Sequence, residues 1–347
     1  MRAVLLKGHG GIEQLEVRDD VPVPVAGRGE VLVGISAAAI NNTDINTRLG
    51  WYSKSVVSAT GSTTAAAAPG DSGWAGGPLS FPRIQGADAC GHIVAVGPNV
   101  DATRVGERVL IDPVIRSAPG VPLYFGSDTP GAFALFAAVP ARNAVAVRST
   151  LSDIELASFP CAYLAAENML TRAQVVAGNR VLVTGASGGV GSAAVQLARR
   201  RGAIVTALSG DAKAALLGAL GASRVLPREA DPVVELGRES IDTVIDVVGG
   251  PRFMRLLDVL VRGGCYAVAG AIAGPVVELD LRTLYLKDLR LLGCTIPGEE
   301  VFPNLVGYIE RGEIRPLISA TFPLSEIAAA QESFLEKSHL GKIVLVL

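Results

Sequence analysis

The apolar residues of this chain follow two different patterns, and the change falls near residue 150. Before it, short apolar runs such as 30–35, 92–96 and 108–111 are separated by Gly, Pro and Asp turns, which predicts a compact β-rich part. After it, strand-length apolar runs alternate with longer helical stretches. This alternation predicts a doubly wound parallel sheet, so the fold class is α/β in two parts.

The predicted strands of the second part lie at 180–184, 204–208, 224–226, 243–247, 264–269 and 290–292. A helix is predicted over 152–176, because Ser152 is a suitable N-cap and Glu155, three residues later, completes a capping box. Residues 341–346 form another strand-like run, which has no obvious partner in this sheet. We expect that run to return to the β-rich part.

A glycine-rich turn follows the first predicted strand of the sheet. Gly185 permits a tight turn, and Gly191 lets the next helix pack closely against the strand. The glycines between them let backbone amides approach a pyrophosphate at the start of the helix, where anions are favoured. The predicted dinucleotide-binding residues of the turn are Gly185, Ser187, Gly188, Gly189, Val190 and Gly191. The alternative is an ordinary strand–turn–helix of an α/β protein, but the next strand follows at the spacing of a βαβ unit.

Composition narrows the function classes. The chain has 347 residues, 49% of them apolar and 18% charged, with a net charge of −2, as expected for a globular enzyme of two domains. No basic stripe suits nucleic acid, no Lys/Arg cluster suits anionic lipid, and no apolar run suits a membrane span. The N-terminus lacks the pattern of a signal peptide, and the scattered cysteines suit a reducing compartment. We therefore expect a cytoplasmic protein whose cysteines are mostly small core residues.

One segment, 53–80, is rich in Ala, Ser, Thr and Gly and is predicted as a long loop. Long loops in compact domains tend to be lids, binding loops or disordered stretches. The aromatic residues Trp51, Tyr52, Trp74 and Phe81 flank it and favour a lid over an apolar substrate. The alternative is a mobile insertion that is anchored by the two tryptophans.

Several short motifs occur together in a fixed order along the whole chain. They are Asn41 to Asp44 with Arg48, Gly50 and Tyr52, then 86–97, 105–109, 131–134, 242–250 and 341–342. This set resembles the zinc-independent, quinone oxidoreductase-like branch of the medium-chain dehydrogenase/reductase superfamily. The resemblance implies a GroES-like catalytic domain over 1–150 and 293–347 and a Rossmann dinucleotide-binding domain over 151–292. It also implies a substrate site in the cleft between the two domains.

The positions that hold zinc in other members of the superfamily indicate that no metal is used here. Zinc-dependent members have a Cys at Asn41, a His-Glu pair at Ala87–Asp88 and a third ligand near Cys161. Only Cys161 could ligate, and a catalytic zinc normally needs three protein ligands. His92 imitates the zinc motif but lies beyond the ligand register, so we interpret it as a structural or surface strand residue.

The end of the second strand of the sheet determines the choice of cofactor. An acidic residue there would hydrogen-bond the ribose of NAD and repel a phosphate, but Ser209 occupies this place. With Lys213, it resembles the phosphate pocket of NADPH-dependent members, and Arg228 is expected to replace a tyrosine that many relatives have. Asp211 leaves the NAD alternative open, and Lys213 is equally compatible with a solvated helix lysine. We predict NADPH.

The catalytic residues implied by the resemblance are Asn41, near the nicotinamide, Asp44, in the floor of the cleft, and Tyr52, as proton donor. A turn or cap role is the alternative for Asp44. Tyr124 and Tyr163 are weaker candidates for proton donor. Further cofactor contacts are expected from two strand ends and from the terminal strand, at Val248, Gly249, Gly270, Ala271 and Lys342.

These observations predict a zinc-independent NADPH-dependent reductase that transfers hydride to a quinone or to an α,β-unsaturated carbonyl group, that is, an enone or enoyl substrate. Without a Lewis acid, hydrogen bonds must polarise the carbonyl, which favours attack on a conjugated system. One alternative is a metal-free alcohol or carbonyl oxidoreductase, and another is a dinucleotide-binding sensor without turnover. The expected partners are a small apolar carbonyl-containing substrate and, from the family likeness, a second copy of the chain.

Overall fold

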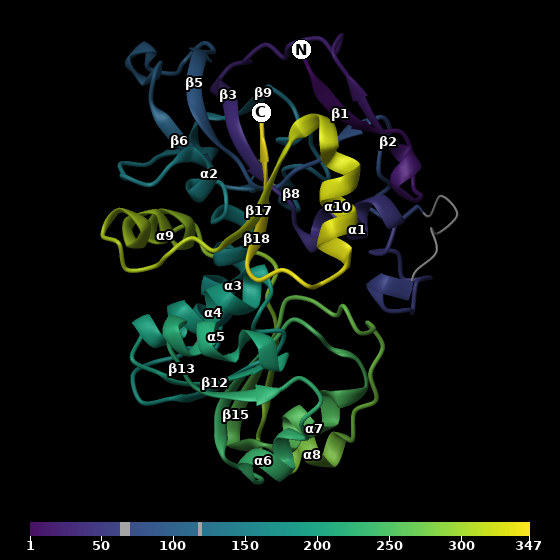
Figure 1. Ribbon diagram of the computed structural model, residues 1–347, viewed down its shortest axis with the longest axis vertical. Coiled ribbons are helices and arrows are strands. Elements are labelled where there is room, and N and C mark those ends of the chain that lie inside the picture. Colours follow the sequence, from purple (N-terminus) through teal and green to yellow (C-terminus); the bar gives the residue numbers. More distant parts are fainter. Residues whose placement is uncertain (63–69, 117–119) are drawn as a thin grey trace. The chain divides into compact units, whose positions relative to one another are not determined.

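The computed structural model describes residues 1–62, 70–116 and 120–347, which form two compact units. Unit 1 comprises the described residues of Met1–Val56, Thr63–Cys161 and Phe302–Leu347. Unit 2 comprises Val57–Ser62 and Ala162–Val301 (Figure 1). The short segment Val57–Ser62 joins unit 2 through a hydrogen bond of 3.1 Å from the amide of Thr60 to the carbonyl of Ile272.

Unit 2 is built on a six-stranded parallel sheet, as the sequence predicts. The strand order is β13-β12-β11-β14-β15-β16. These strands are β11 (Arg180–Val183), β12 (Ile204–Ser209), β13 (Ala222–Pro227), β14 (Ile241–Asp246), β15 (Leu260–Val268) and β16 (Arg290–Gly293). The order reverses between β11 and β14, and open α/β sheets bind ligands beyond the carboxyl ends of the strands at such a point.

The helices of unit 2 cover both faces of this sheet. Helices α4 (Gly189–Arg200) and α5 (Ala214–Leu220) pack beside β11, β12 and β13, whereas α6 (Pro232–Leu236), α7 (Phe253–Asp258) and α8 (Leu281–Leu286) gather at the other face (Figure 1). A buried apolar cluster that includes Val244, Leu257 and Leu260 fills the space between the sheet and the helices α6, α7 and α8. Each helix therefore buries one apolar stripe against strands that are apolar on both sides.

The helical stretch predicted over 152–176 is divided into two helices in the structure. These are α2 (Asp153–Leu156) and α3 (Pro160–Arg172). Proline has no amide hydrogen and is tolerated in the first turn of a helix but not inside one, so Pro160 starts a new helix. The predicted capping box is confirmed, since the Ser152 hydroxyl accepts from the amide of Glu155 at 3.3 Å.

Unit 1 is β-rich, as predicted. Its largest sheet has the order β10-β6-β5-β3-β18-β17, with β9 also paired to β3. These strands are β3 (Glu30–Ala39), β5 (Cys90–Val96), β6 (Arg108–Ile111), β9 (Phe136–Pro140), β10 (Ala144–Ala146), β17 (Ile318–Pro323) and β18 (Lys342–Val346). The terminal strand β18 lies antiparallel to β3, which confirms that the end of the chain returns to this part (Figure 1).

Smaller elements complete unit 1. Strands β1 (Ala3–Leu6), β2 (Leu15–Arg18) and β4 (Arg83–Ile84) form one further sheet, and β7 (Val114–Ile115) pairs with β8 (Leu123–Tyr124). Its helices include α1 (Asn42–Leu49), α9 (Val301–Glu310) and α10 (Ile327–Leu335), and α10 packs on β17 and β18. The predicted strand residue His92 lies within β5, opposite Gly34 and Arg108. None of the described helices is both long and apolar enough to span a membrane.

The two described flanks of the 53–80 segment differ, since residues 57–62 belong to unit 2 and residues 70–80 are anchored to unit 1. The Trp74 ring stacks on Tyr124 with centroids 4.6 Å apart, and the Ser72 hydroxyl lies 2.9 Å from Nε2 of His9. Trp51 is buried and packs edge-on against Tyr52. The centre of the segment, 63–69, lies outside the described residues, so a lid over the substrate stays a prediction.

Candidate active site

The glycine-rich turn between β11 and α4 has the geometry that a dinucleotide requires. Gly185 has a φ of +55°, a conformation that favours glycine. A Cβ at Gly191 would lie only 2.2 Å from the carbonyl oxygen of Gly185, so the first turn of α4 packs directly on the preceding loop. Gly188 precedes the first residue of α4 and leaves the amides of that helix end open to an anion.

The end of β12 brings together the residues that were predicted to recognise a phosphate on the ribose. The Ser209 hydroxyl is buried and has no hydrogen-bond partner among the residues that the structure describes. Ser209 lies opposite Pro227 in the β12–β13 register, so Arg228 follows directly beside it. Burial and the nearby Arg228 lower the pKa of Lys213. The side chain of Asp211 lies outside the described residues, so its predicted effect on cofactor choice stays open.

The carboxyl ends of β14 and β15 bring four other predicted cofactor residues side by side. A Cβ added to Gly249 would lie 3.1 Å from that of Ala271, and one added to Gly270 would lie 3.1 Å from the carbonyl oxygen of Val247. The amides of Val248 and Gly249 both donate to the buried carboxylate of Asp246. Sequence reasoning did not single out Asp246, although an acidic residue inside an apolar strand of a parallel sheet is a usable signal.

In unit 1, a buried polar cluster lies where β3, β5 and β18 meet. The ammonium of Lys342 lies 2.7 Å from Oδ2 of Asp88 and also donates to Oδ1 of Asn41. The Asn41 amide donates to the same Asp88 oxygen at 2.8 Å, and Oδ1 of Asp88 accepts from the backbone amide of Cys161 at 2.6 Å. We call Asn41, Asp88 and Lys342, with the Cys161 amide, the Asp88 cluster.

The contacts of the Asp88 cluster limit what its members can offer to a ligand. The amide of Asn41 also donates to the carbonyl of Ala39 at 3.2 Å, so both of its hydrogens are engaged within the protein. Lys342 is 2% exposed and Asp88 is fully buried. The predicted contacts of Asn41 and Lys342 with the cofactor therefore stay predictions, and in the structure both residues bind the Asp88 carboxylate.

Asp44 lies beside this cluster and caps helix α1. Its carboxylate accepts from the amides of Asn41, at 2.8 Å, and Gly86, at 3.2 Å. Burial raises the pKa of Asp44 to about 7 against the lowering effect of these two amides. The cap role is confirmed, and a contact of Asp44 with substrate stays a prediction.

Two phenols and one thiol of unit 1 are candidate weak acids near Asp44 and Asp88. The Tyr52 hydroxyl donates to Oγ1 of Thr43 at 2.9 Å, and burial raises the pKa of Tyr52 to about 12. The Tyr124 hydroxyl lies 3.1 Å from Sγ of Cys161, and burial raises the pKa of Cys161 to about 12. Tyr163 belongs instead to unit 2, where its hydroxyl accepts from Gln196 at 2.9 Å. Tyr52 and Tyr124 thus keep their protons at neutral pH.

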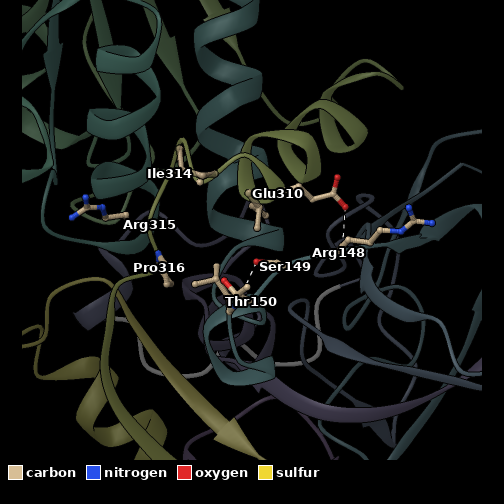
Figure 2. Close-up of a pocket in the computed structure, with 10 residues that line it drawn as sticks. Arg148, Ser149, Thr150, Glu310, Ile314, Arg315 and Pro316 are labelled. Carbon is tan, nitrogen blue, oxygen red and sulfur yellow. Dashed lines mark hydrogen bonds between the residues drawn. The ribbon is translucent and has the colours of Figure 1, made fainter.

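A cavity of about 420 Å³ lies elsewhere in unit 1, between the segment after β10 and the loop after α9. Figure 2 shows that the guanidinium groups of Arg148 and Arg315 point away from one another and out of this cavity. The Glu310 carboxylate accepts a hydrogen bond from the backbone amide of Arg148 at 2.8 Å. None of the predicted site residues lines the cavity, and it offers no convergent set of polar groups.

Comparison with known proteins finds family models that match both parts of the chain. A model of the zinc-binding dehydrogenase family matches residues 189–311, and one of the alcohol dehydrogenase GroES-like domain matches residues 27–149. The crystal structure of a candidate alcohol dehydrogenase from Sinorhizobium meliloti is 48% identical, with a TM-score of 0.89, and the match covers 100% of this chain and 96% of that one.

Two curated relatives match over almost their whole length. Human quinone oxidoreductase is 28% identical over 100% of this chain and 98% of its own. Acryloyl-coenzyme A reductase of Metallosphaera sedula is 29% identical over 99% of both chains. The chain belongs to the medium-chain dehydrogenase/reductase superfamily, in its quinone oxidoreductase-like branch.

As a medium-chain dehydrogenase/reductase, the protein is an oxidoreductase that uses a nicotinamide dinucleotide. Its unit 1 contains the GroES-like domain of the superfamily, and its unit 2 is the Rossmann-type domain. The buried hydroxyl of Ser209 and the open end of α4 are the features of unit 2 that fit this cofactor. Sequence reasoning found these residues and named Asp88 at a zinc position, but it missed the Asp88 cluster, whose members come from distant parts of the chain.

Proposed function

We propose that this protein is an NADPH-dependent reductase that works without zinc and transfers hydride to a quinone or to an α,β-unsaturated carbonyl compound. The names of two relatives, a quinone oxidoreductase and an acryloyl-coenzyme A reductase, support this substrate class. The observation that carries the proposal is the Lys342–Asp88 ion pair, because it occupies the carboxylate that a metal site would need.

The donor set near Asp88 does not fit a zinc ion. Asn41 offers an amide where zinc-dependent members have a thiolate, and the Asp88 oxygens accept from Lys342, Asn41 and the Cys161 amide. Among these residues only Cys161 offers a thiol, whereas a catalytic zinc normally needs three protein ligands. No group of three or more His, Cys, Asp or Glu side chains suited to a metal occurs in the described part of the chain.

Preference for NADPH is supported by the end of β12. The buried Ser209 hydroxyl lacks a partner there, and Lys213 and Arg228 supply two positive charges beside it. A phosphate on the ribose would accept from the hydroxyl and from both cations. An acidic side chain in the place of Ser209 would instead repel that phosphate.

When bound, the nicotinamide supplies the hydride that reduces the substrate. The turn from Gly185 to Gly191 would hold the pyrophosphate, and Ser209 and Lys213 would hold the ribose phosphate. Tyr52 keeps its proton at neutral pH, and its hydroxyl would hydrogen-bond a substrate carbonyl and protonate an enolate if it turned from Oγ1 of Thr43 to the substrate. Trp74 stacks on Tyr124 in the same unit, and contact with this aromatic pair would suit a conjugated substrate.

The test measures NADPH consumption by the purified protein after chelation of metals. A conjugated enone, a quinone and the saturated ketone that matches the enone are compared, each also with NADH. We expect turnover of the enone or the quinone with NADPH, little with the saturated ketone, and no loss on chelation.

Each other outcome selects an alternative. Turnover of the saturated ketone would indicate a metal-free alcohol or carbonyl oxidoreductase. Tight NADPH binding without turnover of any substrate would indicate a dinucleotide-binding sensor. Activity that disappears with the chelator and returns with zinc would contradict the metal-free proposal.

A further inference from the structure

We propose that Asp246 is a positioning residue that fixes the two turns of the dinucleotide site relative to one another. The inference rests on the dinucleotide site of the proposed function. Asp246 itself would touch neither substrate nor cofactor. Asp246 acts through the backbone of Val248 and Gly249 and through the hydroxyl of Thr184.

The Asp246 carboxylate is fully buried at the carboxyl end of β14 and joins three strand ends. It accepts hydrogen bonds from the hydroxyls of Thr184, directly after β11, and Tyr266, in β15. It also accepts from the amide of Val248 at 2.8 Å and from that of Gly249 at 3.1 Å. All of these partners are neutral donors, which together replace the water that the buried charge has lost.

The turn after β14 depends on this carboxylate for its conformation. Gly249 has a φ of 62° and a ψ of −148°, a region that is essentially restricted to glycine. The amides of Val248 and Gly249 point inward to Asp246, and the carbonyl of Val248 accepts from the amide of Ala273 at 2.8 Å. These groups are therefore committed within the protein. Val248 and Gly249 would shape the cofactor site rather than hydrogen-bond the cofactor through these amides.

The same carboxylate also controls the glycine-rich turn. Thr184 donates to Asp246 and accepts from the amide of Val247 at 3.2 Å, and it directly precedes Gly185. A Cβ at Gly185 would lie 3.0 Å from a methyl group of Val247 and 3.1 Å from one of Val248. The two turns thus pack at close range, and a shift of either one moves the other.

The chemistry favours aspartate over its neutral isostere at this place. Each oxygen of Asp246 accepts from at least two donors among two hydroxyls and two amides. An asparagine would direct an NH2 group at some of these donors, which leaves them unpaired in a buried place. The lost hydrogen bonds are those that hold the two turns of the dinucleotide site. Dinucleotide affinity is therefore the property to measure.

The experiment measures the dissociation constants of NADPH and NADH separately by titration calorimetry, below the unfolding temperature of each variant. We expect Asp246→Asn to weaken the binding of NADPH and of NADH about tenfold or more. The factor should be similar for the two cofactors, because the substitution acts on the turns that bind the groups they have in common. At saturating cofactor, kcat should change less than the KM for the cofactor. Tyr266→Phe and Thr184→Val should show smaller losses of the same kind, and Thr184→Ser should restore most of the affinity.

The matched control is Asp242→Asn in the same unit. Asp242 lies near the start of β14, at the opposite end of that strand from Asp246, and its carboxylate accepts from the amide of Arg180 at 2.7 Å. It should lower the melting temperature without changing either dissociation constant. Losses of affinity that follow the losses of stability in both variants would overturn the inference.

The remaining outcomes separate this inference from the proposed function. If the wild-type protein binds neither dinucleotide, the proposed function fails. If it binds and Asp246→Asn binds equally well, only the positioning role fails. If Asp246→Asn does not fold, unchanged affinity in both Tyr266→Phe and Thr184→Val would overturn the inference, and a loss of affinity that Thr184→Ser reverses would support it.

Discussion

Lys342 and Asp88 form a buried ion pair of 2.7 Å that links the last strand of the chain to the loop before β5. Neither residue is more than 2% exposed. Each charge loses much of its favourable hydration free energy when it is buried. The attraction within the pair offsets this loss only if the geometry is good and additional hydrogen bonds are made. Asn41 and the Cys161 amide supply those bonds.

Removal of the cation alone should be strongly destabilising. We expect Lys342→Met to lower the free energy of unfolding by about 3–5 kcal/mol, because Asp88 then remains as an unpaired buried charge. The double variant Lys342→Met with Asp88→Asn should lose less than the sum of the two single variants. Chemical denaturation of all four proteins measures the coupling. Equal and additive losses would show that the pair contributes no specific interaction.

The raised pKa of Asp44 predicts a pH dependence of stability that is opposite to that of most aspartates. Its pKa rises from 3.8 to about 7 on folding, so the folded state binds more protons than the unfolded state between these values. The free energy of unfolding should therefore fall as pH rises through this window, by at most about 4 kcal/mol, and then level off above pH 7. Denaturant unfolding of the wild type at a series of pH values measures the slope.

The variant Asp44→Asn isolates this contribution, because it removes the titrating group and should flatten the slope. The matched control is Asp101→Asn, which alters an exposed cap with a lowered pKa. This control should keep the slope between pH 5 and 7. A wild-type slope that survives in Asp44→Asn would assign the pH dependence to other groups.

The sequence predicts unit 2 well because its elements are specified locally. Apolar residues predominate in β11 and β12, as strands covered on both faces require, and a glycine follows each of these strands at its turn. The division of the 152–176 helix was missed although Pro160 marks it. A proline inside a helical pattern is a direct signal for a new helix start.

The polar centres were harder to predict because their partners are distant in sequence. Asp88 contacts Lys342, Asn41 and the Cys161 amide, and no local pattern relates these positions. Lys342 and Asp88 both lie in family motifs, yet the contact between them was not predicted. A charged residue at the start of an apolar strand, like Asp246 at the end of one, indicates that a buried partner must exist but does not name it.

Cofactor preference can be reversed at the end of β12. We expect Ser209→Asp to weaken NADPH binding about tenfold to a hundredfold relative to NADH, because a carboxylate there repels the ribose phosphate and accepts from a ribose hydroxyl. Lys213→Ala should weaken NADPH alone. The ratio of the two dissociation constants measures the effect.

The control for this experiment introduces the same charge at the other end of the neighbouring strand. Ser223 is exposed near the start of β13, whereas Ser209 pairs with Pro227 at the end of that strand. Ser223→Asp should leave the ratio unchanged. If Ser209→Asp also leaves it unchanged, the phosphate is not bound at this place.

The last prediction concerns the outer edge of the unit 2 sheet, where we expect a second copy of the chain to bind. Strand β16 ends the strand order, with β15 as its neighbour, so its outer backbone groups are available to another strand. Apolar side chains are exposed around it, including Tyr285 at 61% and Leu286 at 57%. Light scattering should give twice the mass of one chain, and Tyr285→Asp should shift it toward the monomer. Val234→Asp, at an exposed apolar position on α6, should not. A monomeric wild type at micromolar concentration would exclude the dimer.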